Sequence, residues 1–414
     1  MNENDFREYA LKYSIQILKI VKILEMVSTV EYMNNNMYVG TKNNVKMQII
    51  ARTKKGIVVL NNVDLLNKNI IHMLLNEKQI EKNNCYINQN LDGILKNEGS
   101  LNSSMELSEV FQIIDNINSI WDKNENRAKC SYKEYFREYE FLVNKNRIMR
   151  KNKLSTISFN FINRNGIQIR DIILLNRKNI NKDINDIYYL YNSMKLSFRK
   201  QFPQYSEIVL GEKVMCTIIK KFSYIFYENT KKILNCKLPS SFEINSNIKI
   251  IDNPFSGFFS EVLFDDCLYK NQIIELVSTN KLFANVDYEY LERGKLCKAN
   301  QYLNRNNVYI SHYTTLELES GSTDIPTLIS DNSIIPIIYN LNIDEKSINY
   351  SDTTFWADCF VKIQKFHYRA RFYTSFFWLL SEIEYIGKER KAIISNCVSP
   401  SVEIKLKRSK LFFE

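Results

Sequence analysis

The residues best suited to metal chemistry are scarce in this chain of 414 residues, which has only three histidines, His72, His312 and His367. A zinc peptidase helix needs two histidines on one face, beside a glutamate that activates the metal-bound water. No two of these histidines lie three to five residues apart. The eight cysteines include no Cys-x-x-Cys pair, which argues against a zinc ribbon. The sequence therefore predicts no metal site.

Two other groupings have a chemical interpretation and a plainer structural one. Asp265 and Asp266, with Glu261 nearby, could supply carboxylates for acid/base work or a hard metal, but carboxylates at a strand end usually form turns. Cys397 and His367 could act as nucleophile and base. Nothing in the sequence brings these two together, and a thiol in a β-rich segment is more often a small core residue. Neither grouping predicts a catalytic site.

An aromatic run extends from residue 366 to residue 378 and includes two arginines. Such a run could stack the bases of single-stranded nucleic acid. Alternating aromatic strands with arginines are more often a buried sheet or a subunit interface. We therefore take Phe372, Phe376 and Trp378 as candidate interface residues.

The composition indicates an ordinary globular protein with a formal net charge of +10. The lysines and arginines are spread in short, separate groups, which is typical of solvated faces, so nucleic-acid binding is not favoured and an acidic partner surface is the alternative. Scattered cysteines without an apolar leader predict reduced thiols in a cytoplasmic protein. No apolar run reaches the ~20 residues of a membrane span.

Hydrophobic periodicity predicts an α+β protein: an N-terminal helix/strand domain followed by a mainly antiparallel β C-terminal domain. Helices are expected at 5–26, 70–75, 107–121, 182–200 and 212–234, and hairpins at 45–60 and 157–169. The segment 201–204 (QFPQ) breaks a helical pattern. We place the domain boundary there, with domains 1–204 and 205–414. From residue 248 onward, short apolar runs alternate with turn residues, and the run 371–380 is among the expected strands.

Four segments, taken in order, resemble the TldD/PmbA family of gyrase modulators, also called TldD/TldE peptidases. Residues 248–254 (IKIIDNP) resemble a strand that ends in an Asp-x-Pro turn, and 260–266 (SEVLFDD) resemble the Phe-Asp segment that follows it. Residues 273–282 (IIELVSTNKL) are similar to the next hairpin, and 396–404 (NCVSPSVEI) resemble the C-terminal strand of the PmbA/TldE branch. The resemblance covers residues from about 207 to the end. Most of the family's glycines are absent.

The resemblance implies a zinc-bearing TldD subunit, with His-Glu-x-x-x-His and a distant cysteine, and a TldE partner that keeps the fold without the ligands. The corresponding positions here are Lys220, Lys221 and Tyr224, with Ile386 where the cysteine would stand. Ammonium groups repel Zn²⁺ rather than bind it. The chain is thus expected to bind no cofactor itself, zinc being confined to a TldD-like partner.

The resulting interpretation is a non-catalytic TldE/PmbA-like subunit of a zinc metallopeptidase that cleaves unfolded or leader peptides. It would form a heterodimer with a TldD-like chain, or a homodimer, and hold the peptide as an added strand. Two alternatives stay open. One is a stand-alone peptide-binding or scaffold protein, and the other is a hydrolase with an unrecognised site.

Overall fold

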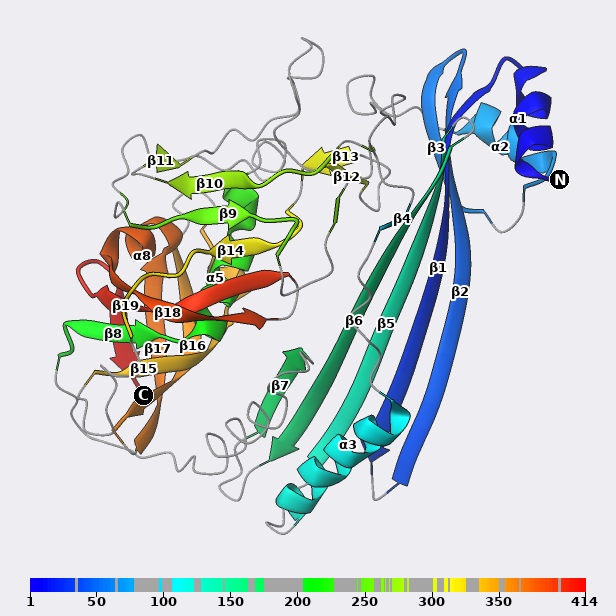
Figure 1. Ribbon diagram of the computed structural model, residues 1–414. Helices are drawn as coiled ribbons and strands as arrows, with labels where there is room; N and C mark the ends of the chain where they lie inside the picture. The colour runs from blue at the N-terminus through cyan, green and yellow to red at the C-terminus, as the bar shows by residue number, and fades with distance from the viewer. Residues whose placement is uncertain are drawn as a thin grey trace.

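Two large β-sheets, each with its own helices and apolar core, lie side by side in the computed structural model of the chain (Figure 1). The architecture is α+β, as the sequence predicts. The structure describes residues 1–33, 36–63, 66–77, 97–98, 106–122, 128–143, 146–162, 168–174, 204–226, 244, 247–256, 262–263, 265, 268, 270–278, 281–282, 301–303, 309–311, 313–324, 335–349, 354–364, 366–393 and 396–414.

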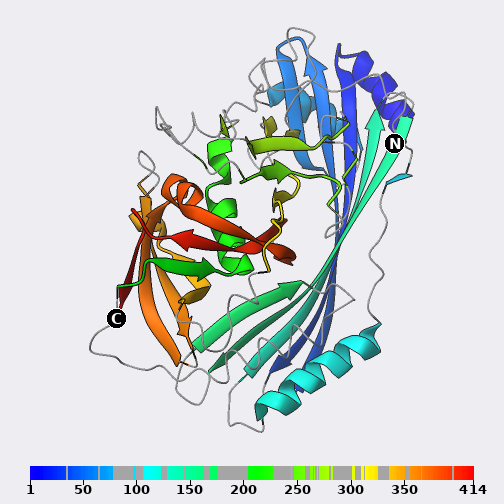
Figure 2. The ribbon, with the colours of Figure 1, turned by 60° about the vertical axis from the view of Figure 1, so that its left-hand side comes forward.

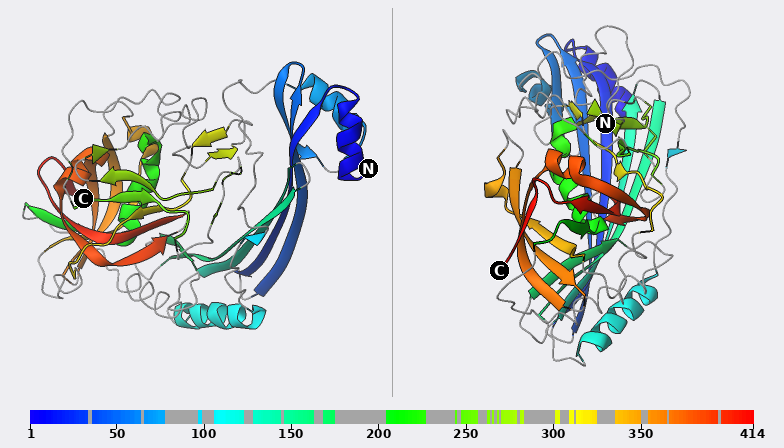
Figure 3. Two further views of the ribbon diagram at one scale, coloured as in Figure 1. Left: turned by 45° about the horizontal axis from the view of Figure 1, so that its top comes forward. Right: turned by 90° about the vertical axis from the view of Figure 1, so that its left-hand side faces the viewer.

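The first sheet is built mainly from long antiparallel strands that curve together, with the short strand β4 pairing parallel to β6 (Figures 1 and 3). Its described strands are β1 (Gln16–Met33), β2 (Asn36–Thr53), β3 (Gly56–Val63), β4 (Asn97–Glu98), β5 (Ala128–Val143), β6 (Asn146–Ile162) and β7 (Gln168–Leu174). Their order is β3-β2-β1-β5-β6-β4, with β7 also pairing β6. The alternation of side chains along these strands fixes which residues share a face.

Three helices accompany this sheet: α1 (Glu3–Leu11), α2 (Asn69–Asn76) and α3 (Leu107–Asp122). One end of the sheet packs against α1 and α2, where Phe6, Ala10, Ile71 and Leu74 form a core with Ile49. At the other end α3 contacts β5 (Figure 1).

The second sheet begins at β8 and includes most of the remaining strands. They are β8 (Glu207–Leu210), β9 (Ile250–Asp252), β10 (Ile274–Ser278), β11 (Lys281–Leu282), β14 (Leu316–Leu318), β15 (Ile337–Ile343), β16 (Thr354–Ile363), β17 (Phe366–Ser375), β18 (Ile383–Ile393), β19 (Cys397–Lys405) and β20 (Lys410–Phe413). The order is β11-β10-β9-β14-β19-β8-β15-β16-β17-β20, and β18 pairs β19. Two of the pairs, β14 with β19 and β8 with β15, are parallel, and the others are antiparallel. A separate pair is formed by β12 (Gln301–Leu303) and β13 (Tyr309–Ser311).

The principal helix of the second half, α5 (Glu212–Lys221), packs against β15, β18 and β19 (Figure 2). It is followed by the 3-10 turn η1 (Ser223–Phe226). A further 3-10 turn, η3 (Glu345–Ser347), precedes β16, and α8 (Phe376–Glu382) follows β17. None of the described helices is long and apolar enough to cross a membrane.

The two halves meet through Leu268, which is fully buried. Its side chain joins a cluster with Val21, Phe141, Val143 and Ile148 of the first sheet. A contact between β7 and β18 adds to this junction. The predicted boundary at 204/205 falls between β7, the last strand of the first sheet, and β8.

Most predicted elements are present, but three expectations need correction. The helix predicted at 5–26 ends at Leu11, and a strand runs from Gln16 because Ser14 (φ 57°) breaks the helix and β-branched residues follow. The run predicted as a strand at 371–380 becomes helix α8 from Phe376. The Ser375 hydroxyl caps this helix by accepting a hydrogen bond from the Trp378 amide. The helix predicted from 212 ends at 221, and the part beyond 226 lies outside the described residues, as does the whole helix predicted at 182–200.

Candidate functional site

Helix α5 is held at its start by a close approach of two backbone segments. The Gly211 amide donates to the Ile338 carbonyl at 2.9 Å. A Cβ on Gly211 would lie 3.3 Å from that same oxygen, so the absence of a side chain lets β8 turn directly into the helix. One face of α5 is then buried in the core through Val214, Met215, Cys216, Ile218 and Ile219.

The residues at the metal-motif positions lie at the other end of α5 and on β18, which packs against it. Lys220 and Lys221 occupy the last turn, and Lys221 pairs with Glu345. Tyr224 follows in η1, where its ring centroid lies 6.1 Å from that of Phe222. Ile386 is buried in the same apolar core as the inner face of the helix.

Three of these four groups offer zinc no ligand, because an ammonium has no lone pair to donate and an isoleucine has no donor atom at all. The phenol of Tyr224 alone would not make the four-ligand set that zinc prefers. Two cations at the C-terminal end of a helix are instead stabilised by the helix dipole. Partial burial lowers the pKa of Lys220; nearby Cys397 opposes this shift and Lys221 reinforces it. Among the described residues, no group of three or more His, Cys, Asp or Glu side chains could hold a metal ion. The donor set therefore does not fit zinc.

A pair of buried thiols beside Lys220 was not predicted from the sequence. Cys216 of α5 is hydrogen-bonded to Cys397, the first residue of β19. Burial, reinforced by Cys397, raises the pKa of Cys216 well above its usual value. The Cys216 thiol is therefore protonated at neutral pH, and the pair packs as small core residues. The sequence favours a core position for Cys397, and the apolar helix face gives one to Cys216, but no local signal brings the two thiols together.

Tyr313 and Asp252 complete the surroundings of Cys397. Burial, with a contribution from Cys397, raises the pKa of Tyr313 to about 12, so its phenol is neutral. The Asp252 carboxylate accepts three hydrogen bonds. The donors are the Thr314 amide at 2.8 Å, the Thr314 hydroxyl at 2.6 Å and the Thr315 amide at 3.1 Å. These bonds tie the Asp-x-Pro turn to the segment that leads into β14. The role of Asp252 is structural.

Gly321 fixes the position of Ile386 on β18. A Cβ at Gly321 would overlap the Ile386 carbonyl oxygen and lie 3.0 Å from its carbonyl carbon. The Gly321 amide donates to the Gly387 carbonyl at 3.0 Å, and the Lys388 amide donates to the Thr323 carbonyl at 2.8 Å. Only glycine allows this approach.

The other residues with chemical potential are not brought together. His367 lies on β17, and the sheet order places β16, β15 and β8 between it and Cys397 on β19. His367 is 2% exposed, and neither of its ring nitrogens has a hydrogen-bond partner. Burial, reinforced by Lys362, lowers the pKa of His367 to about 4. Asp265 is buried, whereas Glu261, Asp266 and His312 lie outside the described residues.

The candidate interface residues need a correction. Phe372 and Phe376 are fully buried in the core of the second sheet, so their side chains cannot meet another subunit. Trp378 is half-buried, with its ring 5.9 Å from Tyr373. The error for Phe372 arises because the sequence of one strand does not reveal which of its two faces is covered. For Phe376 and Trp378 it arises because the run was taken as a strand throughout, whereas it becomes helix α8.

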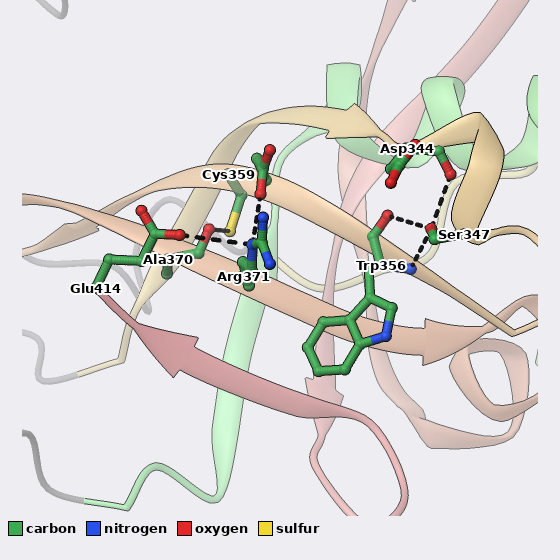
Figure 4. A network of polar contacts seen from close by, with 8 residues as sticks. Asp344, Ser347, Trp356, Cys359, Ala370, Arg371 and Glu414 are labelled. Carbon is green, nitrogen blue, oxygen red and sulfur yellow. Dashed lines mark hydrogen bonds and ion pairs between the residues drawn. The ribbon is translucent and has the colours of Figure 1, made fainter.

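The exposed aromatics of this region lie on the opposite face of β16, β17 and β20. Trp356 is 38% exposed, and its backbone is held by hydrogen bonds with Ser347 and Asp344 (Figure 4). Its ring centroid lies 4.6 Å from that of Tyr373 and 5.5 Å from that of Phe412. The rings are tilted by 40° and 38° relative to the Trp356 ring and form one aromatic cluster across the three strands.

Comparisons with known proteins identify the fold but no sequence relative. The sequence matches no known family profile and no curated protein. Three solved structures match over nearly the whole chain. A candidate modulator of a DNA gyrase from Thermotoga maritima MSB8 has a TM-score of 0.77 at 12% identity and covers 99% of this chain and 98% of its own.

The second structure is TldE from Thermococcus kodakarensis, with a TM-score of 0.73 at 12% identity and 99% coverage of both chains. The third is a candidate modulator of DNA gyrase from Bacteroides thetaiotaomicron VPI-5482, with a TM-score of 0.70 at 11% identity and coverage of 99% and 97%. The chain thus has the fold of the gyrase-modulator and TldE structures, in agreement with the resemblance to the TldD/PmbA family drawn from its sequence.

Proposed function

We propose that this protein is the non-catalytic, TldE-like subunit of a heteromeric zinc peptidase that acts on unfolded or leader peptides. The fold, shared with TldE over 99% of both chains, supports the family assignment. The observation that carries the non-catalytic role is the end of α5, where Lys220, Lys221 and Tyr224 stand at the metal-motif positions.

Zinc, in this proposal, belongs to a TldD-like partner, and the present chain contributes shape to the chamber that receives the peptide. A cytoplasmic location is part of the proposal. It is supported by the free thiols of Cys130, Cys216, Cys359 and Cys397, since such thiols persist in reducing compartments.

Reconstitution with a TldD-like chain tests the proposal directly. The present chain alone should contain no stoichiometric zinc and should cleave no extended peptide. The pair should contain zinc and should cleave extended peptides. Sedimentation of the 49.0 kDa chain with and without the partner should show a heteromer. Its interface should bury more than ~2,000 Å², as obligate interfaces do.

Two outcomes would replace this function. Stoichiometric zinc or cleavage by the lone chain would identify a hydrolase with an unrecognised site. A chain that stays monomeric beside the candidate partner, yet binds extended peptides, would be a stand-alone binding protein.

A further inference from the structure

The first sheet has a long open edge at β2. Strand β3 pairs with β2 only from Met47 to Thr53. Residues 37–46 of β2 therefore pair with β1 alone among the strands that the structure describes. At about 3.4 Å per residue this edge is roughly 34 Å long. Such a length offers a continuous row of main-chain donors and acceptors to another strand.

The side chains of this edge divide into two chemically different faces. Met37, Val39 and Val45 alternate onto one face and are 38%, 57% and 60% exposed. The other face carries Lys42 and Lys46, and residues 36–46 include no acidic side chain. The first face is thus mainly apolar, with Thr41 and Asn43 between the apolar residues. The second carries two lysines along the edge strand itself, and Glu25 of β1 beside them pairs with Arg137.

The edge lies away from the candidate site. The described contacts of the first sheet with the second half involve β7, which meets β18, and the residues of β1, β5 and β6 that surround Leu268. In the sheet order β2 is separated from β6 by β1 and β5, and β2 lies on the far side from the second sheet (Figures 1 and 3). A peptide held at β2 would be remote from α5, so this edge suits a partner subunit better than a substrate.

We propose that residues 37–46 of β2 pair with an edge strand of a partner chain in which apolar and acidic residues alternate. Strand addition would put the partner's apolar side chains beside Met37, Val39 and Val45, and its carboxylates beside Lys42 and Lys46. That a partner subunit exists rests on the proposed function. The alternation of apolar and acidic residues in its strand is inferred from the side chains of the β2 edge.

A second copy of this chain fits the edge poorly. Self-pairing would bring the strand with Lys42 and Lys46 against an identical strand that offers no carboxylate. Like charges on neighbouring strands are destabilising. Charge complementarity therefore selects a different chain with an acidic strand.

Binding of synthetic peptides to the isolated chain tests the edge without any partner. The probe is a fluorescent peptide as long as the open edge, with alternating valine and glutamate, measured by fluorescence anisotropy. We expect it to bind about tenfold more tightly than the valine and lysine analogue, a difference of about 1.4 kcal/mol. N-methylation of every second residue, in the register that faces β2, should abolish binding. Equal binding of the acidic, basic and N-methylated peptides would overturn the proposal.

Matched variants locate the binding. The double variant Lys42→Glu/Lys46→Glu should reverse the preference, so that the lysine peptide binds more tightly. Val39→Asp should weaken both peptides. The control Lys12→Glu/Lys54→Glu makes the same charge change at exposed positions outside the edge and should leave the preference unchanged. A control that behaves like the edge variant would place the peptide elsewhere and overturn the assignment.

Assembly with a TldD-like subunit separates this proposal from the proposed function. Val39→Asp should impair co-purification of the pair, whereas Lys12→Glu/Lys54→Glu should not. A pair that forms unchanged with Val39→Asp refutes the edge and leaves the subunit role intact. If the wild-type chain alone forms a dimer and Val39→Asp converts it to a monomer, a second copy of this chain occupies the edge. That result would refute the proposal.

Discussion

His367 is a neutral, buried imidazole whose two nitrogens make no hydrogen bond, beside the ring of Tyr339 at 5.8 Å. Its pKa falls from the ordinary value of 6.5 to about 4. The unfolded chain therefore takes up a proton more readily than the folded one between these values, and the free energy of unfolding decreases as the pH falls from 6.5 toward 4. This contribution is constant above pH 6.5. Each unit of pKa difference is worth about 1.4 kcal/mol, so the difference between 6.5 and about 4 predicts a loss on the order of 3 kcal/mol by pH 4.

Urea denaturation of wild type and His367→Phe between pH 7 and pH 4 measures this contribution. The difference in free energy of unfolding between the two proteins should shift in favour of the variant as the pH falls. His72→Gln, at an exposed position, is the control substitution that leaves the buried imidazole of His367 in place. Parallel pH curves for wild type and His367→Phe would contradict the prediction.

Gly321 gives a second prediction, because its backbone touches that of Ile386. Gly321→Ala would force the two segments apart, and we expect a loss of about 1–3 kcal/mol in the free energy of unfolding. Gly40→Ala is the matched control, since a Cβ there would meet only the hydroxyl of Thr29 at 3.2 Å, which can rotate away. Chemical denaturation checks both. Equal effects of the two variants would show that the contact at Gly321 relaxes easily.

Helix α5 connects β8 to the core and presents two lysines at its C-terminal end. If these lysines only complement the helix dipole, Lys220→Ala/Lys221→Ala should lower the free energy of unfolding by about 1 kcal/mol. The peptidase activity of the reconstituted pair should stay within a few fold of wild type. Steady-state kinetics measure the activity of the pair with each variant, and a pair that lacks the partner's own catalytic glutamate is the control. A loss of activity as large as in that control would show that the lysines take part in the chemistry.

The whole molecule depends on the junction at Leu268, which inserts into the cluster of Val21, Phe141 and Ile148. Leu268→Ala should cost about 2–4 kcal/mol, because it leaves a cavity between the halves. Each sheet keeps its own core, so calorimetry should show one unfolding transition for the wild type and two for the variant. Ile273→Ala, at a residue that is 53% exposed, is the control. A single transition in both variants would mean that other contacts couple the halves.

Much of the fold could be predicted because local periodicity survives folding. The apolar spacing at 107–121 and the alternation at 45–60 marked α3 and the β2–β3 hairpin, since those residues face a core on one side only. The N-terminal strand was mistaken for a helix because Ile17, Ile20 and Leu24 also recur at helical spacing. Periodicity alone does not separate the two when both faces of a strand are partly covered.

The sequence by itself determined which donor atoms stand at the end of α5, because residue types decide ligand chemistry: a protonated lysine and an isoleucine offer zinc no ligand. Only the tertiary structure decided which groups meet. The pairing of Cys216 with Cys397, the burial of Phe372 and Phe376, and the open edge of β2 all depend on contacts between segments far apart in the chain. Which distant segments meet is a property of the assembled layers, and no local pattern encodes it.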